Sequence, residues 1–375
     1  MVGDQPSIAI FGRRDQGRLS TRDAGDRAAL CRYGHHSTGC GETMSGWSRR
    51  ISAAMLIGWL AMVGLVSIVQ VAAAQEPIAE SRPRFDVSIG TWISTGDTRW
   101  AHDASSVPGL GNPTSKLVYR DVGTNVVELT GKAWLNQRWF GRVNGGFGQV
   151  GGGRLVDEDF VSIGGQRLIS QTTSNLPDDS MYYINADIGA RVLEFRNHRG
   201  YIEIFGGYQY WHTKFTAQGI GEQVCNPTFL TCGGSEAAMR PVISNTTNWH
   251  SFRIGTSSEY RLTTRLSVLG SVAFSPVSIL DNNDVHHLRT SGPSALAQDP
   301  SISMSGYSIG TNADISARFA IARGLFVNVG YRVWWNKALD GDVTFNSLSG
   351  GSSTHPLVEF QSFRHGLTAG LSYTF

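Results

Sequence analysis

Long segments of this sequence alternate between two sets of side chains, and that pattern constrains the fold more than any other feature. One face of residues 201–211 carries Tyr201, Glu203, Phe205, Gly207, Gln209 and Trp211, and the other carries Ile202, Ile204, Gly206, Tyr208 and Tyr210. Residues 85–93 and 367–375 alternate in the same way, and no long stretch after Phe85 has helical periodicity. Because successive side chains of a strand point to opposite faces, the pattern predicts β-strands between an apolar and a wetter environment.

The composition excludes several classes of protein. The chain has 375 residues, of which 45 are glycine, 17% are charged and 10% are aromatic, and its formal net charge is +2. These values argue against a disordered chain and against a nucleic-acid partner. A mean hydropathy of −0.15 excludes a multi-span helical membrane protein. Few charges, many glycines and many aromatics without high hydropathy fit a closed barrel in a bacterial outer membrane.

One apolar segment near the start has the features of an export signal. Residues 51–74 are almost purely apolar, follow Arg49 and Arg50, and end in three alanines before Gln75. A basic start, an apolar middle and small residues at the end are typical of a secretory signal peptide. The alternative is a permanent transmembrane helix, since the segment is long enough to span a bilayer.

The export signal sets the predicted domain boundaries. We expect residues 1–43 to be an unstructured upstream extension, residues 44–74 to be a Sec signal peptide, and residues 75–375 to form a single barrel domain. Cleavage after Ala74 leaves 375 − 74 = 301 residues.

Short and long connections alternate along the exported part. The short links are predicted at 136–138, 196–199, 262–264 and 320–324, and the long polar links at 97–115, 158–179, 217–246, 282–301 and 346–358. Nine links join ten strands, and an even number of antiparallel strands suits a closed transmembrane β-barrel. Short periplasmic turns and long extracellular loops are the usual arrangement in outer-membrane barrels. A soluble β-sandwich would also alternate, and it is the alternative fold.

Aromatic residues and the chain end favour the membrane barrel over the sandwich. We expect interfacial girdles from aromatics near the strand ends, namely Trp134, Trp139, Tyr208, Tyr210, Trp211, Trp334 and Trp335. Phe375 ends an alternating strand, which resembles the C-terminal signal read by the outer-membrane assembly machinery. We expect a monomer in contact with outer-membrane lipid.

Two of the four cysteines lie in the exported part. Cys225 and Cys232 are in a stretch rich in Gly, Pro and Thr, and a disulfide between them suits an oxidising compartment. We expect no metal site, because no second Cys or His pair sits at zinc spacing.

Two acidic motifs are conspicuous in a chain with so few charges. Asp157 and Asp159 are two residues apart, as are Asp284 and His286, so each pair shares one face of a strand. Both pairs fall where a strand meets a long link, and lipid is an unfavourable environment for them, so we expect them in the lumen. A carboxylate beside a histidine raises its basicity, and two close carboxylates can hold a water. The alternative is that these are solvated loop acids.

The exported chain resembles the omptin family of outer-membrane proteases along nearly its whole length. Residues 151–160 resemble the family's Gly-rich strand ending in V-D-Q-D-W, and residues 282–286 its D-N-D-E-H. Residues 207–209 with 215–217 are similar to its G-Y-Q…F-T-A, and residues 368–375 to its T-A-G-L-K-Y-T-F. Omptins are ten-stranded barrels, so the resemblance implies the same architecture.

The resemblance implies a catalytic role for both acidic motifs. Asp157 and Asp159 match the family's catalytic Asp pair, and Asp284 and His286 match its His–Asp dyad. In the family's mechanism a water lies between the two pairs, the histidine takes its proton, and the dyad aspartate stabilises the imidazolium. The resemblance implies no covalent intermediate and no cofactor.

The sequence departs from the family at the positions that select substrates. Omptins cut between basic residues with two acids in the S1 pocket, and the matching positions here are Trp100 and Asn282. Asp97 and Asp281 lie close by in the sequence as candidate substitutes.

The lipid-binding positions of the family are also changed. Omptins need lipopolysaccharide, held partly by Tyr, Glu and Arg that alternate on one strand. The matching positions here are Tyr208, Tyr210 and His212, and Lys214 is a candidate phosphate contact.

The sequence therefore predicts an omptin-like endopeptidase with its site facing the exterior, acting on peptide or protein substrates. A non-enzymatic outer-membrane barrel, such as a pore, an adhesin or a degenerate protease, is the alternative.

Overall fold

A computed structural model describes residues 85–375 except 163–164 and 196–197. The predicted extension at 1–43 and signal peptide at 44–74 lie outside the described residues. The thirteen β segments are β1 (Phe85–His102), β2 (Leu110–Arg120), β3 (Thr124–Trp134), β4 (Trp139–Gly151), β5 (Arg154–Val161), β6 (Arg167–Asn175), β7 (Asp178–Glu194), β8 (Gly200–Cys225), β9 (Glu236–Arg261), β10 (Leu266–His286), β11 (Ile302–Ala322), β12 (Leu325–Asn346) and β13 (Ser352–Thr374).

These segments form one closed antiparallel sheet. The first and last strands pair from Asp86 opposite Thr374 to His102 opposite Leu357, and the Phe375 amide donates to the Phe85 carbonyl at 2.9 Å. One circuit of the ring passes β1, β3, β4, β7 and β8–β13, and a second passes β1, β2, β5, β6 and β8–β13. Each circuit therefore contains ten segments.

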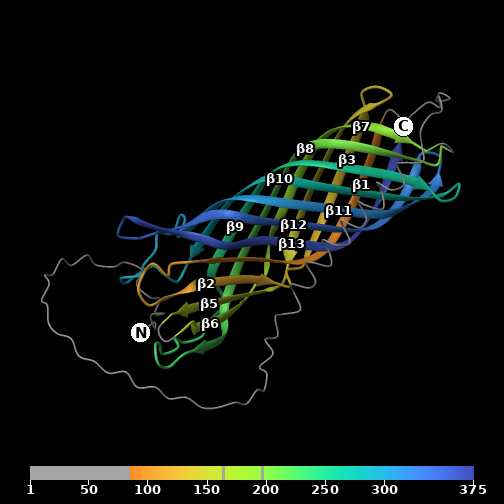
Figure 1. Cartoon of the computed structure of the whole chain (residues 1–375). Helices are drawn as coiled ribbons and strands as arrows, with labels where there is room; N and C mark the ends of the chain where they lie inside the picture. Colours follow the sequence, from red (N-terminus) through yellow and green to blue (C-terminus); the bar gives the residue numbers. More distant parts are fainter. Residues whose placement is uncertain (1–84, 163–164, 196–197) are drawn as a thin grey trace, which may run out of the picture. The chain divides into compact units, whose positions relative to one another are not determined.

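Three neighbouring strands break at one level of the barrel, which is why thirteen segments make ten strands. β2 is followed by β3, β4 by β5, and β6 by β7 across these breaks. The breaks are joined across the sheet, because the Gly151 amide donates to the Gly123 carbonyl at 2.9 Å and the Leu176 amide to the Gly153 carbonyl at 3.0 Å. Gly152 and Gly153 have φ of +107° and +139°, a backbone conformation that favours glycine. Beyond the breaks, β2, β5 and β6 lie together at one end of the barrel (Figure 1).

The outer wall carries a wide apolar band. Its exposed large side chains include Val87, Ile89, Ile93, Val127, Leu129, Val143, Phe147, Ile184, Ile188, Ile204, Phe252, Ile254, Phe274, Ile279, Ile315, Phe319, Val329, Leu367 and Leu371. A closed ring with an apolar exterior satisfies its backbone hydrogen bonds internally, as a membrane requires. The predicted fold class, an all-β transmembrane antiparallel barrel, is confirmed. Among the described residues, no helix is long and apolar enough to cross a bilayer.

The two ends of the barrel differ in their connections. At the short-turn end, residues 135–138, 195–199, 262–265 and 323–324 join the strands, and at the long-loop end residues 103–109, 162–166, 226–235, 287–301 and 347–351 do. The predicted long links were wrong in extent: for example, β8 runs on to Cys225 and β9 begins at Glu236. Many outward side chains at this end are polar, so the apolar alternation weakens in the sequence while the backbone pairing continues.

An aromatic layer fills the lumen at mid-height. The Trp334 ring lies 5.0 Å from Trp92, 4.7 Å from Tyr183 and 5.6 Å from Trp211, measured between centroids. Trp211 and Trp334 are only 1% and 2% exposed, so their predicted place in an interfacial girdle was wrong. Period-two alternation does not say which face is inside, and these two rings belong to the inner face.

Below the aromatic layer, the short-turn end encloses a polar cavity that we call the vestibule. It has a volume of about 1440 Å³, and its wall is held by ion pairs. Lys132 lies 2.7 Å from Glu203, and Arg142 and Arg253 both contact Asp187, at 2.9 and 2.7 Å. Six further pairs lie in the same region, namely Arg191–Glu203, Arg191–Glu194, Arg318–Asp86, Arg318–Glu259, Arg332–Glu128 and Arg332–Asp314. Opposite charges are thus matched across the lumen.

The strand breaks yield a stability prediction. A Cβ on Gly153 would lie 3.0 Å from the Arg120 carbonyl oxygen and 3.1 Å from the Val122 Cα, at a φ that L residues rarely adopt. We expect Gly153→Ala to lower the free energy of unfolding by roughly 1–3 kcal/mol. Thermal unfolding in detergent, followed by the mobility shift of the folded barrel on gels, measures this. Gly141→Ala is the control, since a Cβ there meets nothing within 4 Å. Equal stability of the two variants would contradict the proposed strain.

Candidate functional site

The strand breaks determine where β5 places its two aspartates. Beyond them, Asp157 lies opposite Leu117 on β2 and Asp159 opposite Ser115. Leu117 is only 1% exposed and belongs to the interior cluster, so this face of β2 and β5 points into the barrel. Both aspartates therefore line the lumen at the long-loop end.

The last residues of β10 supply the second pair. From Ser278 onward the even-numbered residues Leu280, Asn282 and Asp284 are fully buried, while Ile279 and Asp281 are exposed. Asp284 is thus on the inward face, and His286 continues the same face two residues later. The His286 amide donates to Ser301 Oγ at 2.9 Å, and its carbonyl accepts from Gln298 Nε2 at 3.1 Å, which fixes the end of the strand.

The two pairs meet through their charges. Asp157 interacts electrostatically with Asp284, although β5 and β10 are not neighbours in the sheet. Burial raises the pKa of the Tyr119 hydroxyl, on β2, well above its ordinary value. The nearby carboxyls of Asp284 and Asp157 raise it further. Both predicted motifs therefore approach each other inside the lumen, with Tyr119 beside them.

Burial dominates the protonation of these groups. It raises the pKa of Asp284 to about 8, and it lowers the pKa of His286 to about 3 with help from the nearby Arg289 cation. Burial, followed by the charges of Asp159 and Asp284, also raises the pKa of Asp157 well above its ordinary value. The outward residues of β10 beside Asp284 and His286 include the polar Asp281 and Asn283, so the site lies beyond the apolar band.

The same groups have unused hydrogen-bonding capacity. Among the described residues, Asp157 Oδ1, both carboxylate oxygens of Asp284 and His286 Nε2 are buried without a well-formed hydrogen bond. Asp284 therefore accepts no hydrogen bond from His286 here. Donors from Asn245, Trp100 and the Val285 amide lie close enough to Asp284 to lower its pKa against the larger effect of burial. Buried polar atoms are normally paired, and catalytic contacts often form only when substrate binds. Unpaired donors and acceptors gathered at one place can bind a polar reactant.

Arg289 is a candidate site residue that the motifs did not reveal. It follows β10, and its Nε and Nη2 donate to the Ser294 carbonyl at 3.2 and 2.9 Å. Its guanidinium interacts with Asp157 and Asp159, and those carboxyls raise its pKa against the larger lowering effect of burial. It lies three residues beyond His286, but its convergence with Asp157 depends on the path of the loop, so no spacing rule identifies it.

The four predicted substrate-selecting residues do not all face the lumen, because neighbouring residues of a strand point to opposite faces. Trp100 is 1% and Asn282 0% exposed, and both point inward. Asn282 exchanges amide hydrogen bonds with Asn245 at 3.2 and 3.0 Å, so its neutral side chain is fixed. Asp97 and Asp281 were candidate substitutes for the missing acids, but both face outward. Asp97 accepts from the Asp121 amide at 2.9 Å and Asp281 from Asn248 Nδ2 at 3.2 Å.

The four candidate lipid contacts form one outward row on β8. Tyr208, Tyr210, His212 and Lys214 alternate with buried inward residues. Tyr210 and His212 both contact Asn248 Oδ1 at 2.8 Å, and the Tyr208 hydroxyl is 2.7 Å from His250 Nδ1. The row lies on the outer surface at the upper edge of the apolar band.

The Cys225–Cys232 disulfide is formed in the structure, with the two Cα atoms 5.5 Å apart. It links the end of β8 to the loop that leads into β9.

Comparison with known proteins identifies a solved structure with a similar fold. No protein-family model and no curated protein matches the sequence. The crystal structure of the outer membrane protease OmpT from Escherichia coli is similar, with a TM-score of 0.63 and 16% identity over 80% of this chain and 100% of that one. The likeness is one of fold. The translocator domain of the autotransporter NalP from Neisseria meningitidis, with a TM-score of 0.32 and 10% identity, covers 87% of this chain and 98% of its own, and it supports no argument.

The burial of Asp284 predicts a pH-dependent stability. Its folded-state pKa of about 8 is above its ordinary 3.8, so the folded state binds the proton more tightly and stability falls as pH rises between these values. We expect Asp284→Asn to raise the free energy of unfolding at pH 8.5 by roughly 1–3 kcal/mol, with a much smaller effect at about pH 4. Thermal unfolding at both pH values measures this. Asp281→Asn, on the exposed face of the same strand, is the control, and an equal gain there would refute the burial argument.

Proposed function

We propose that the protein is an omptin-like endopeptidase of the bacterial outer membrane, with Asp157, Asp159, Asp284 and His286 at its catalytic site. The observation that carries the proposal is the convergence of Asp157 with Asp284 inside the lumen, where Asp157 Oδ1, both Asp284 oxygens and His286 Nε2 make no well-formed hydrogen bond within the part of the chain that the structure describes. Structural restraint alone gives no reason to bury such groups unpaired.

The chemistry follows from the protonation states. With its pKa lowered to about 3, His286 is neutral near pH 7 and can take a proton from a water. That water attacks the peptide carbonyl, and the proton passes through His286 to the leaving amine. Asp157 holds the water, and Asp159 supports Asp157. Asp284 releases its own proton to solvent and, as a carboxylate, stabilises the imidazolium. No residue of the chain becomes covalently attached to substrate.

The interior argues for this function over a pore. Trp92, Tyr183, Trp211 and Trp334 fill the lumen between the vestibule and the candidate site. Ion pairs such as Lys132–Glu203 hold the vestibule wall. A conducting barrel needs a continuous aqueous path.

The outer membrane is the proposed location, with the long-loop end and its site outside the cell. The apolar band and the outward row on β8 support this orientation, since long loops of such barrels are extracellular. Lipopolysaccharide is the proposed lipid partner, contacting Tyr208, Tyr210, His212 and Lys214. The outer-membrane assembly machinery is the proposed route of insertion.

The catalytic assignment predicts the effect of single substitutions. We expect the chain refolded with lipopolysaccharide to cleave members of a peptide library, and His286→Ala and Asp157→Ala each to lower kcat/KM by at least about 100-fold. Mass spectrometry of the products measures cleavage, and His287→Ala is the neighbouring control, since His287 Nε2 instead contacts Ser244 Oγ at 2.8 Å. Unchanged cleavage by both the His286→Ala and the Asp157→Ala variants would contradict the mechanism.

The neutral side chains at Trp100 and Asn282 predict a departure in specificity. A buried carboxylate is needed to compensate a buried Lys or Arg, and here Asp97 and Asp281 face away from the lumen. We therefore expect peptides with Arg–Arg to be cut no faster than peptides with neutral residues at the scissile bond. Competition between matched peptide pairs measures the ratio of kcat/KM values. A preference for Arg–Arg above about tenfold would show that other acids serve the pocket.

A further inference from the structure

Asp159 differs from the other acids of the site because both its oxygens are occupied. Its Oδ1 accepts from Ser115 Oγ at 2.8 Å, and its Oδ2 accepts from Ser170 Oγ at 3.0 Å. The two serines come from opposite sides, since β2 and β6 are the two neighbours of β5. Ser115 and Ser170 each lie directly opposite Asp159 in the sheet register. The carboxylate is thus clamped along the row of hydrogen-bonded strands.

The seam between β6 and β8 supports one half of this clamp. Ser170 lies opposite Cys225, and only a short run, ending with Thr173 opposite Glu222, pairs the two strands before the register shifts. Cys225 is the last residue of β8, where a strand would otherwise fray. The disulfide to Cys232 fixes that residue, as does the Asn226 amide, which donates to the Ile169 carbonyl at 2.7 Å.

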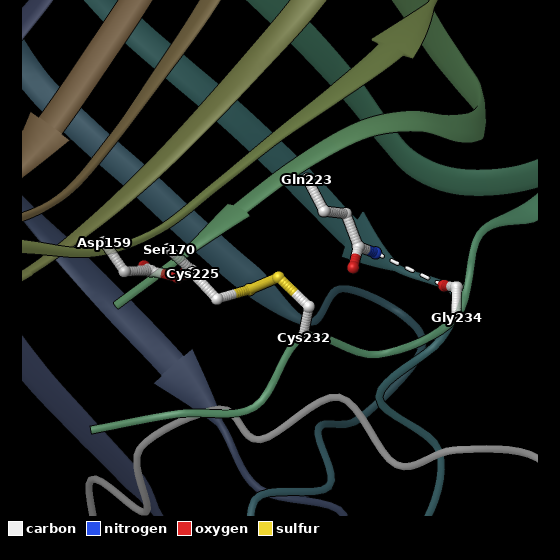
Figure 2. Close-up of a disulfide and its surroundings, with 6 residues drawn as sticks. All are labelled: Asp159, Ser170, Gln223, Cys225, Cys232 and Gly234. Carbon is white, nitrogen blue, oxygen red and sulfur yellow. Dashed lines mark hydrogen bonds between the residues drawn. A yellow bond between two sulfur atoms is a disulfide. The ribbon is translucent and has the colours of Figure 1, made fainter. Parts of the chain in front are cut away.

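Figure 2 shows the disulfide beside Ser170 and Asp159, with Gln223 Nε2 reaching back to the Gly234 carbonyl at 3.3 Å. The loop 226–235 is therefore fastened to β8 at two points. Cys232 is exposed, so a reductant in solution can reach this bond.

We propose that Ser115 and Ser170 are positioning residues that fix the carboxylate of Asp159, and that the Cys225–Cys232 disulfide holds Ser170 in place through the β6–β8 seam. The inference rests on the proposed function, because it assigns what supports Asp159 within that site. Asp159 in turn stands next to Asp157 on the same face of β5, and the two charges interact. A fixed Asp159 sets the position of Asp157 and of the water it holds.

The hydroxyls also affect protonation in a definite direction. Burial raises the pKa of Asp159, and the hydrogen bonds from Ser115 and Ser170 lower it, as does the charge of Arg289. Asp157, on the same strand, interacts with this carboxyl, and Asp157 in turn interacts with Glu158 and Asp284. Loss of either hydroxyl therefore raises the pKa of Asp159 further.

The first experiment measures cleavage by full-length variants. We expect Ser115→Ala and Ser170→Ala each to lower kcat about tenfold with KM unchanged, and Ser170→Thr to restore most of the loss. Ser308→Ala is the control, since that Oγ is buried without a partner among the described residues. Values for Ser170→Ala that match the control, or no rescue by threonine, would overturn the proposal.

The second experiment tests the disulfide in a background without the other two cysteines, Cys31→Ser and Cys40→Ser, which lie in the predicted upstream extension. We expect dithiothreitol, or Cys225→Ser with Cys232→Ser, to lower kcat toward the Ser170→Ala value. The same treatment should have little further effect on Ser170→Ala, because the two changes act through one contact. Equal fold losses in both backgrounds would show that the disulfide acts elsewhere, and no loss at all would remove it from the proposal.

A third measurement separates this proposal from the catalytic assignment. Carbon-13 NMR of labelled aspartate carboxyls, with Asp159→Asn to assign the signal, follows the titration of Asp159 without any turnover. We expect Ser170→Ala to move its midpoint upward by about one pH unit. If no peptide is cleaved by the wild-type chain, the proposed function fails while this shift still supports the clamp. An unmoved midpoint overturns the clamp whatever the activity.

Discussion

Pairing of the last strand with the first is the constraint on which the rest of the structure depends. β13 runs beside β1 for almost the whole length of both, and the terminal Phe375 amide bonds to Phe85. A membrane offers no partner for an unpaired backbone amide, so an open sheet of this kind could not expose the apolar band. Closure also fixes which side chains share the lumen, and thereby brings β5 and β10 to face one interior.

Within that closed ring, the three aligned breaks give the site its place. Below them the strands β3, β4 and β7 line the vestibule, and above them β2, β5 and β6 follow a second circuit of the same size. Arg364, buried in the lumen, donates to the Val122 carbonyl at 2.7 Å at the level of the breaks. The chain thus keeps a closed ring of paired strands around both circuits while β5 takes a new course. Asp157 and Asp159 owe their inward position to that change of direction.

Much of this architecture could be predicted from the sequence, because alternation is a local property. Because charges are scarce, Asp157, Asp159, Asp284 and His286 also stand out in the sequence alone. Local patterns do not say which face is inward, and that is why Trp211 and Trp334 were misplaced in a girdle. The sequence does show that neighbouring residues of one strand face opposite sides, and this alternation separates Asp281 from Asn282. The contacts of Asp159 could not be predicted from the sequence, because Ser115 and Ser170 reach it only through the register of three paired strands.

The matched charges of the vestibule have a consequence for how such a chain can change over time. Asp187 serves two arginines, and Glu203 serves Lys132 and Arg191. Removing one partner of a buried pair leaves the other charge uncompensated, at a penalty of about 3–5 kcal/mol. A substitution of one partner alone therefore destabilises the barrel, whereas a simultaneous substitution of both partners need not. In related sequences, charged residues of the vestibule should therefore change in pairs. Residues at the long-loop end can change one at a time as substrates change.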